Sequence, residues 1–295
     1  MTSLKKIDAV NPARGAHWVG DGFPVRSLFN YQVEARDNSP FLMLDYGGPH
    51  NFAPAMRPRG VGTHPHKGFE TVTIVYDGEV AHRDSAGNGG TIGPGDVQWM
   101  TAARGIIHEE FHSPNYSNTG GPFRMVQLWV NLPAKDKMSP PGYQAITSAD
   151  IPVVPLTGGT ARIIAGEFRG AHGPARTFTP VNLWDVRLDQ AADLTLDFPE
   201  GHNVMLAVLS GSVLINGTQK ANEAEIVRLE RDGKDITIHT DGEAIVLILT
   251  GTPIDEPVVG YGPFVMNTQE EIRQAALDFN SGRFGQVTAP QPTTR

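Results

Sequence analysis

The histidines of this 295-residue sequence are concentrated in one region of the chain. Of ten histidines, five lie between residues 64 and 112, namely His64, His66, His82, His108 and His112. Two pairs have a spacing of two residues: His64 with His66, and His108 with Glu110. Imidazole and carboxylate groups at this spacing suit a metal site or acid–base chemistry, so this region is the candidate site.

These pairs can form one site if each of them lies on an extended strand. Successive side chains of a strand alternate between its faces, so His64 and His66 share a face, as do His108 and Glu110. Two such strands facing each other would bring three imidazoles and a carboxylate to one point. These ligands suit a divalent first-row metal such as iron, manganese, nickel or zinc. In an octahedral site they would leave two positions, enough for a substrate oxygen and dioxygen.

Two neighbours of the second pair receive other interpretations. Glu109 lies between His108 and Glu110 and is expected to face away from them. His112 shares the alternation of His108 and is able to line a pocket, but a position in the following loop is favoured.

The elements that carry these residues are predicted to be short β-strands joined by tight turns. The chain holds 33 glycines and 23 prolines, an excess that marks many turns, while 39% of its residues are hydrophobic and support packed cores. This pattern predicts an all-β protein of the jelly-roll kind. The predicted strands are Ser27–Val33, Phe41–Leu44, Thr71–Tyr76, Asp96–Met100, Phe123–Val130, Arg162–Phe168, Leu183–Leu188, Val204–Leu209, Ser212–Ile215, Glu225–Leu229 and Ala244–Leu249.

The predicted strands also suggest roles for two further side chains, His82 and Gln127. His82 follows a predicted hairpin strand and is expected to be a surface or structural histidine. Gln127 lies on a predicted barrel strand, where a buried amide needs a partner such as a metal-bound water or a substrate.

One helix and one boundary complete the predicted organisation. Thr268 and Glu271 form a capping box before an apolar stripe, which predicts a helix over 268–281 that ends at Gly282. The polar, proline-rich segment 133–142 predicts a boundary between an N-terminal domain, 1–135, and a C-terminal domain, 143–285. Residues 286–295 are expected to form a flexible tail.

The two domains show a weak internal similarity. Aligning Gly78 with Gly211, an offset of 133 residues, places TIVYDGEVAH against LAVLSGSVLI. Both segments are predicted to be a strand, a tight turn and a strand. The same offset sets Asp197, Pro199, Asp241 and Glu243 opposite the four candidate ligands. A second site of the same kind is therefore not expected in the C-terminal domain.

Composition excludes several classes of function. The sequence has no cysteine, which excludes disulfides, thiolate metal sites and a cysteine nucleophile. Its formal net charge is −8 and it lacks a basic stripe, so direct nucleic-acid binding is not expected. No apolar run approaches the ~20 residues that span a bilayer, and the N-terminus lacks the apolar core of a secretory signal. We therefore expect a cytoplasmic protein without membrane contact.

Longer motifs resemble a known family. The HPH sequence followed by Glu70 resembles the first metal motif of the cupin superfamily, and ARGIIH, ending at His108, resembles the second. Alanine replaces the proline of the second motif, and the lead glycine of the first is displaced to Gly60 or Gly62. The stretches HPHKGFETVT, GPGDVQWMTAARGIIHEE, QLWVNLP and YGPFVMNTQEEI are similar to signature stretches of the pirin family.

The resemblance implies a bicupin fold, with two tandem jelly-roll barrels between about residue 5 and residue 285 and the short C-terminal helix. It implies one Fe(2+) ion per chain, in the N-terminal barrel, and a degenerate C-terminal barrel. The family's metal ligands fall on His64, His66, His108 and Glu110. Other divalent first-row metals suit the same ligands, so iron is expected from the resemblance.

The fourth ligand has two candidates. Glu70 occupies the general cupin position and shares the alternation of His66, whereas Glu110 occupies the pirin position. Glu110 is favoured, with Glu70 as a carboxylate that supports the ligands or the fold. Either glutamate is a candidate catalytic residue that accepts a proton from the substrate.

The resemblance implies an oxidoreductase similar to pirin-like quercetin 2,3-dioxygenases. The substrates would be a flavonol such as quercetin, or a different catechol-like compound, together with dioxygen. The alternative is a metal- or redox-responsive regulatory protein that acts through protein partners, as eukaryotic pirin does. A monomer is expected in either case.

Overall fold

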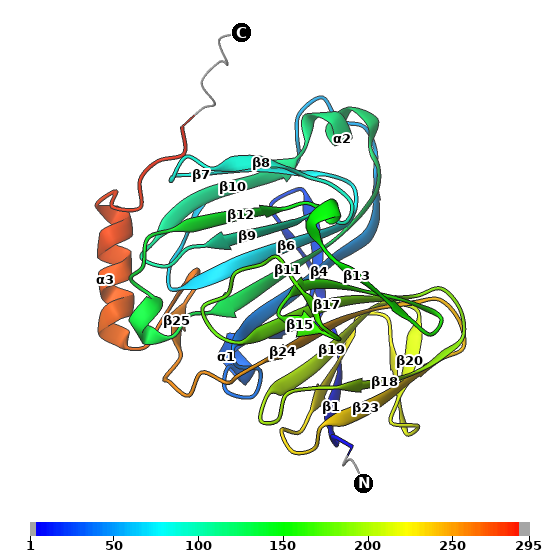
Figure 1. Ribbon diagram of the computed structural model, residues 1–295. Helices are drawn as coiled ribbons and strands as arrows, with labels where there is room; N and C mark the ends of the chain where they lie inside the picture. Colours follow the sequence, from blue (N-terminus) through cyan, green and yellow to red (C-terminus); the bar gives the residue numbers. More distant parts are fainter. Residues whose placement is uncertain (1–3, 289–295) are drawn as a thin grey trace.

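The computed structural model describes residues 4–288 as two β-barrels (Figure 1), which confirms the all-β, two-barrel prediction. The expected tail 286–295 lies outside the described residues from residue 289 onward. The strands of the N-terminal barrel are β2 (Ala16–Val19), β3 (Phe23–Asn30), β4 (Phe41–Phe52), β5 (Gly60–His66), β6 (Phe69–Asp77), β7 (Val80–Asp84), β8 (Gly89–Ile92), β9 (Val97–Thr101), β10 (Ile106–His112), β11 (Gly121–Asn131) and β12 (Gly142–Ile146).

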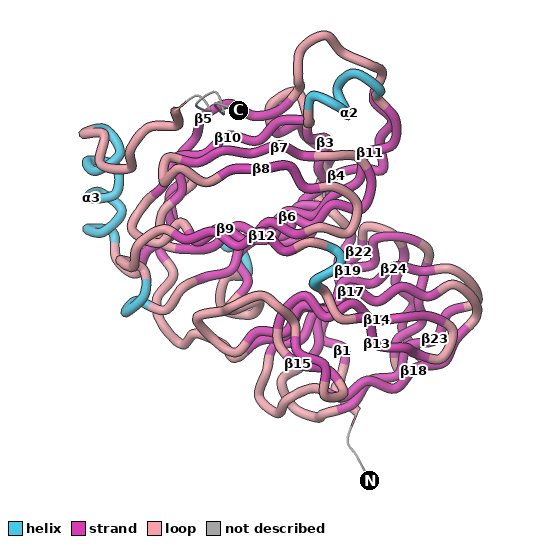
Figure 2. The backbone as a smooth tube through the Cα atoms, turned by 45° about the horizontal axis from the view of Figure 1, so that its top comes forward, coloured by secondary structure: helices cyan, strands magenta, loops and turns pink. Residues whose placement is uncertain are grey.

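These strands form two sheets that enclose the barrel interior. The seven-stranded sheet has the order β12-β9-β6-β11-β4-β3-β2, and the four-stranded sheet has the order β5-β10-β7-β8. Figure 2 shows β10, β7 and β8 above β9, β12 and β6. The short helices α1 (Tyr31–Glu34) and α2 (Pro114–Thr119) lie in connections between strands.

The C-terminal barrel repeats this plan. Its seven-stranded sheet has the order β1-β22-β19-β24-β17-β14-β13, and its four-stranded sheet has the order β18-β23-β20-β21. The bounds are β1 (Ile7–Pro12), β13 (Val153–Leu156), β14 (Gly159–Ala165), β17 (Val181–Leu188), β18 (Ala192–Asp197), β19 (Asn203–Ser210), β20 (Ser212–Ile215), β21 (Gln219–Asn222), β22 (Glu225–Leu229), β23 (Asp235–Thr240) and β24 (Ala244–Gly251). Two small hairpins, β15 (Glu167–Phe168) with β16 (Ala171–His172) and β25 (Val259–Tyr261) with β26 (Phe264–Met266), extend from the barrels.

Two strands pair with the barrel of the other predicted domain. Strand β1 pairs with β22 of the C-terminal barrel, although it begins the described chain, and β12 pairs with β9 across the predicted boundary segment. The helix α3 (Gln269–Asn280) lies beside the N-terminal barrel in Figure 1. Its Ile272 packs with Phe264 of β26 against Ile107 of β10. The division between the barrels therefore follows strand pairing and not chain order.

Local sequence explains where the predicted elements differ from the structure. The predicted strand 27–33 ends at Asn30, because the side chain of Asn30 accepts a hydrogen bond from the Gln32 amide and starts α1. The predicted strand 162–168 breaks at Gly166, where φ is +74° and a Cβ atom would lie 1.9 Å from Asn182 Oδ1.

The predicted C-terminal helix is confirmed. Its N-cap is Thr268, whose hydroxyl accepts a 3.2 Å hydrogen bond from the Glu271 amide. The helix ends just before Gly282, which has a φ of +75°. Among residues 4–288, none of the helices has the length and apolar character needed to cross a membrane.

A shared core lies between the two seven-stranded sheets. Val72 and Ile74 of β6 pack there with Met205 and Leu247 of the C-terminal barrel. The residues between them, such as Thr73, therefore face the interior of the N-terminal barrel, because side chains alternate along a strand. Strand β6 thus supplies one face to the joint core and one to the barrel interior.

A buried charge cluster crosses this core. Asp185 of β17 is fully buried and accepts hydrogen bonds from Arg162 Nη1 at 3.0 Å and Tyr76 Oη at 3.2 Å. Arg187 also forms an ion pair with this carboxylate, at 2.9 Å. The cluster links the barrels, because Tyr76 belongs to the N-terminal barrel and the charged groups to the other.

We predict that Asp185→Ala destabilises the protein by about 3–5 kcal/mol, because it leaves the buried guanidinium of Arg162 without its charge partner. Chemical denaturation measures the free energy of unfolding. Asp197→Ala, at an exposed position of the same barrel, is the control and should change it by less than about 0.5 kcal/mol. Equal effects of the two substitutions would contradict the prediction.

Candidate metal centre

Three histidines converge at one end of the N-terminal barrel. Strands β5 and β10 pair in the antiparallel sense, with His108 opposite His64 and Ile106 opposite His66. The ring centroid of His108 lies 4.3 Å from that of His64 and 4.8 Å from that of His66. Ligand nitrogens of the three rings lie within 4.8 Å of one another. The structure therefore brings together the three predicted imidazoles.

The protonation of these rings suits a cation. Burial and the neighbouring histidines lower the pKa of His66 and of His108 well below the ordinary value, and burial lowers that of His64. All three rings are therefore neutral near pH 7 and have a lone pair to offer. The Nδ1 of His64 lies 2.8 Å from the Gly62 carbonyl, so it carries the proton and leaves Nε2 available.

Orphaned nitrogens show that the cluster fits a metal ion. Both ring nitrogens of His108 and the Nδ1 of His66 are buried without a hydrogen-bond partner among residues 4–288. A buried polar atom without a partner costs about 1–3 kcal/mol, so such atoms gather where a ligand satisfies them. Neutral imidazole nitrogens are ligands for divalent first-row metals, and the donor set therefore fits the expected type of ion.

Glu110 lies in the barrel interior but outside this close group. It follows His108 on β10 after a bulge relative to β5, which sets it opposite Val61. Its side chain accepts a 3.4 Å hydrogen bond from Thr73 Oγ1, which in turn accepts one of 3.0 Å from Gln127 Nε2. Burial raises the pKa of the Glu110 carboxyl to about 7. Gln127 thus has a protein partner where sequence alone suggested a water or a substrate.

Glu70 faces away from the histidines. It pairs with Thr101 across β6 and β9 and accepts a 2.7 Å hydrogen bond from the Thr101 hydroxyl. This is the face of β6 that also carries Val72 and Ile74 into the core between the barrels. The expectation that Glu70 shares a face with His66 needs correction, because the turn at Lys67-Gly68 separates their strands and resets the alternation.

The other two histidines of this region are buried in the barrel. His112 belongs to β10 rather than to a loop, and its Nε2 lies 2.9 Å from the Gly22 carbonyl among the rings of Phe23 and Phe123. His82 on β7 is buried and hydrogen-bonded to the hydroxyl of Tyr143, so it is not a surface residue.

Glu109 faces away from its two neighbours on β10, as expected. Its carboxylate forms an ion pair with Arg83, on the outer face of the four-stranded sheet. The pair leaves the inner face of β10 to His108 and Glu110.

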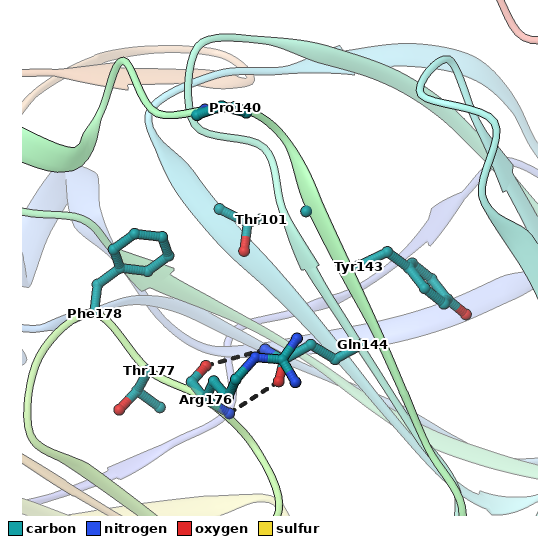
Figure 3. Close-up of a pocket in the computed structure, with 8 residues that line it drawn as sticks. Thr101, Pro140, Tyr143, Gln144, Arg176, Thr177 and Phe178 are labelled. Carbon is teal, nitrogen blue, oxygen red and sulfur yellow. Dashed lines mark hydrogen bonds between the residues drawn. The ribbon is translucent and has the colours of Figure 1, made fainter.

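Aromatic rings flank the histidine cluster. Phe69 and Trp129 stack with centroids 4.2 Å apart, and each lies 5.3 Å from the ring of His66. A second feature lies at the edge strand β12, where a pocket of about 260 Å³ is lined by Thr101, Arg176 and Phe178 (Figure 3). Tyr143 also lines this pocket, but its ring points away from Arg176.

The C-terminal barrel fills the corresponding space with apolar side chains. Its strands β18 and β23 occupy the places of β5 and β10 in the sheet order. Their buried, inward residues are Leu194, Leu196, Ile236 and Ile238. The alignment of Asp241 and Glu243 with the metal ligands is wrong, because both residues lie in the turn between β23 and β24. An offset of 133 residues aligns the hairpins at Gly78 and Gly211. The offset between equivalent strands is smaller further along the chain, as for β10 and β23.

Comparisons with known proteins agree with this architecture. Residues 22–130 match the Pirin family and residues 183–285 match the Pirin C-terminal cupin domain. A Pseudomonas aeruginosa protein named "Putative quercetin 2,3-dioxygenase" is 53% identical over 283 residues, which cover 95% of this chain and 99% of that protein. Human pirin is 37% identical over 259 residues, or 85% of each chain. The crystal structure of quercetin 2,3-dioxygenase from Acinetobacter baumannii has a TM-score of 0.95 and 50% identity, and the match covers 97% of this chain and 100% of that chain.

The fold and the histidine cluster define a protein with two cupin domains and a candidate metal site in the first of them. Within that class, the chain belongs to the pirin family. The resemblance found in the HPH, ARGIIH and YGPFVMNTQEEI motifs is therefore confirmed.

We predict that His108→Ala lowers the affinity for ferrous iron by at least ~100-fold, because it removes the most deeply buried of the three imidazoles. Equilibrium dialysis with metal analysis of the retained protein measures the loss. His112→Ala removes a buried histidine from the same strand outside the cluster, so it should lower stability and retain the metal. Retention of iron by His108→Ala would contradict the assignment of the cluster.

We also predict that metal affinity depends on pH through Glu110. Its carboxyl has a pKa of about 7 and must lose its proton to bind a cation, so affinity should fall about tenfold per unit below pH 7 and level off above it. The three histidines contribute little to the pH dependence near pH 7, because they are already neutral there. Glu110→Gln should flatten the profile.

Glu70→Gln is the matched control for this profile. Burial raises the pKa of Glu70 to about 7 as well, but its carboxylate lies on the other face of β6, bonded to Thr101 and turned away from the barrel interior. The pH dependence of metal affinity should therefore be the same in Glu70→Gln as in the wild-type protein. A profile flattened by Glu70→Gln and not by Glu110→Gln would reverse the assignment of the fourth ligand.

Proposed function

We propose that this protein is an iron-dependent dioxygenase that opens the ring of a flavonol such as quercetin, in the manner of quercetin 2,3-dioxygenases. The observation that carries the proposal is the group of three neutral imidazoles within 4.8 Å of one another inside a barrel. The names of the Pseudomonas relative and of the Acinetobacter structure point to the same reaction.

His64, His66, His108 and Glu110 would hold the iron. When bound, the metal supplies Lewis acidity toward a substrate oxygen and one-electron chemistry toward dioxygen. The set is one carboxylate and three imidazoles, which is the ligand chemistry that iron and its first-row neighbours accept. No cysteine is needed for this reaction, and the chain has none.

The surroundings of the cluster suit an aromatic substrate. The stacked rings of Phe69 and Trp129 beside His66 provide an apolar wall against which a flat ring system can pack. Aromatic pairs of this kind contribute about 0.5–1.5 kcal/mol beyond their buried area. The wall thus favours a planar polyphenol over a small aliphatic acid.

Glu110 is the proton acceptor in this proposal. Its carboxylate can accept the 3-hydroxyl proton of a flavonol as the substrate binds. The hydrogen bond from Thr73 Oγ1 to Glu110 Oε1 holds the carboxylate toward the interior, and Gln127 holds Thr73 in turn. These two neighbours therefore orient the acceptor without touching the substrate.

The test is dioxygen uptake by the iron-loaded protein. Protein loaded anaerobically with ferrous iron is mixed with quercetin in air, and we expect one dioxygen consumed and one carbon monoxide released for each flavonol lost. His108→Ala and Glu110→Ala should lower the rate by at least about 100-fold, and His112→Ala should retain it. Full turnover by Glu110→Ala with its iron in place would contradict the assigned role.

The regulatory alternative gives a different result in the same experiment. Iron that binds without any uptake of dioxygen, and whose oxidation changes the affinity for a protein partner, would replace the enzymatic proposal. Uptake with another catechol-like compound in place of quercetin would keep the reaction class and change the substrate.

A further inference from the structure

A buried histidine outside the metal cluster has one nitrogen without a partner. His82 is 4% exposed, and its Nε2 is hydrogen-bonded to the hydroxyl of Tyr143. Its Nδ1 is buried and has no hydrogen-bond partner among residues 4–288. In a protein interior such an atom costs about 1–3 kcal/mol unless a ligand or a water satisfies it.

The bond to Tyr143 decides which nitrogen of His82 carries the proton. Burial lowers the pKa of His82 to about 4 and raises that of Tyr143 to about 12, so both side chains are neutral at pH 7. The phenol O–H is a stronger acid than the N–H of a neutral imidazole, so we assign Tyr143 as the donor and Nε2 of His82 as the acceptor. The proton of the ring is then on Nδ1, and His82 presents a free N–H donor.

This donor lies on the inner face of the four-stranded sheet. In the pairing of β7 with β10, His82 lies opposite Glu110, and Asp84 lies opposite His108. Its neighbour on the same face, Val80, packs in an apolar cluster of the barrel. His82 therefore shares the interior with the metal cluster, while Arg83 between Val80 and Asp84 faces outward.

The pair lies between the two sheets of the barrel. Tyr143 lies on β12 and His82 on β7, so their hydrogen bond joins the two sheets near the outer strands β8 and β12. Gly90 of β8 lies beside the bond, and a Cβ atom there would be 3.8 Å from the Tyr143 hydroxyl.

A second orphaned atom belongs to the facing sheet. Gln98 of β9 pairs with Thr73, and it shares the inner face of that sheet. Its Oε1 is buried without a hydrogen-bond partner among the described residues. A donor from His82 and an acceptor from Gln98 are complementary to a hydroxyl group, which accepts one hydrogen bond and donates another.

We propose that His82, held by Tyr143, binds a phenolic hydroxyl of the substrate inside the N-terminal barrel and gives the site its preference for hydroxylated flavonols. The inference rests on the proposed function and adds to it a residue that selects the substrate. His82 is not a metal ligand in this assignment, since its Nε2 accepts the bond from Tyr143 and its Nδ1 carries the proton.

The test compares the binding of two flavonols under anaerobic conditions. Quercetin carries several ring hydroxyls, whereas 3-hydroxyflavone keeps only the 3-hydroxyl and the 4-carbonyl. We expect His82→Leu to weaken quercetin binding by about 10-fold or more and to leave 3-hydroxyflavone binding nearly unchanged. His82→Asn keeps an amide donor near the position of Nδ1 and should restore most of the preference. Fluorescence titration of the iron-loaded protein measures both affinities.

Two further variants separate recognition from structure. Tyr143→Phe keeps the ring and removes only the hydroxyl that fixes the tautomer, so it should weaken quercetin binding to an intermediate degree. Arg83→Ala, on the outer face of the same strand, should have no effect on either flavonol. Iron content and the unfolding temperature are measured for every variant, so that a loss of fold is recognised.

Several outcomes would overturn the inference. Equal losses for both flavonols would give His82 a structural role only. Unchanged affinities would mean that a water satisfies Nδ1, and a wild-type protein that binds neither flavonol would also contradict it. Binding with the expected preference but without turnover would contradict the proposed dioxygenase function and leave this inference standing.

Discussion

Three imidazoles share one point because β5 and β10 pair in a register that sets His108 opposite His64. A shift of this register by one residue would turn the imidazoles of one strand to the outer face of the sheet. The main-chain pairing continues on either side of the histidines, with Ile106 opposite His66 and Phe111 opposite Gly60. Glu109 is paired with Arg83 on the outer face, and His112 is held among aromatic rings at the far end of β10. The candidate metal centre thus depends on main-chain pairing before it depends on its own side chains.

The two barrels use the same sheet order for opposite purposes. In the C-terminal barrel, Leu196 and Ile236 meet in a continuous apolar core, which contributes stability. In the N-terminal barrel, the equivalent layer holds polar and neutral titratable groups whose burial is costly without a ligand. The apolar barrel and the core between the sheets offset that cost. The C-terminal barrel therefore helps to stabilise a chain whose N-terminal barrel buries these polar groups.

The sequence alone predicted the three histidines of this site, because they are recognised from short stretches of neighbouring residues. The spacing of His64 and His66, and the motif that ends at His108, need only the alternation of a strand and a family pattern. The position of Glu70 could not be predicted in the same way, since the turn at Lys67-Gly68 breaks the alternation. The role of His82 depends on Tyr143, 61 residues away, and no spacing rule connects them. The pairing of β1 and β12 with the barrel of the other predicted domain could not be predicted either. Edge strands have only a weak hydrophobic pattern in the sequence.

The turn beside the metal site is held by the last elements of the described chain. The Val265 amide donates to the Lys67 carbonyl at 3.0 Å, and Lys67 Nζ forms a buried 3.0 Å ion pair with Asp278 of α3. During synthesis, His64, His66 and His108 leave the ribosome long before these residues do. The turn that follows His66 therefore gains this support only after Val265 and Asp278 have been synthesised. Assembly of the histidine cluster is in this way coupled to synthesis of α3, and a chain truncated before Asp278 would lack this ion pair.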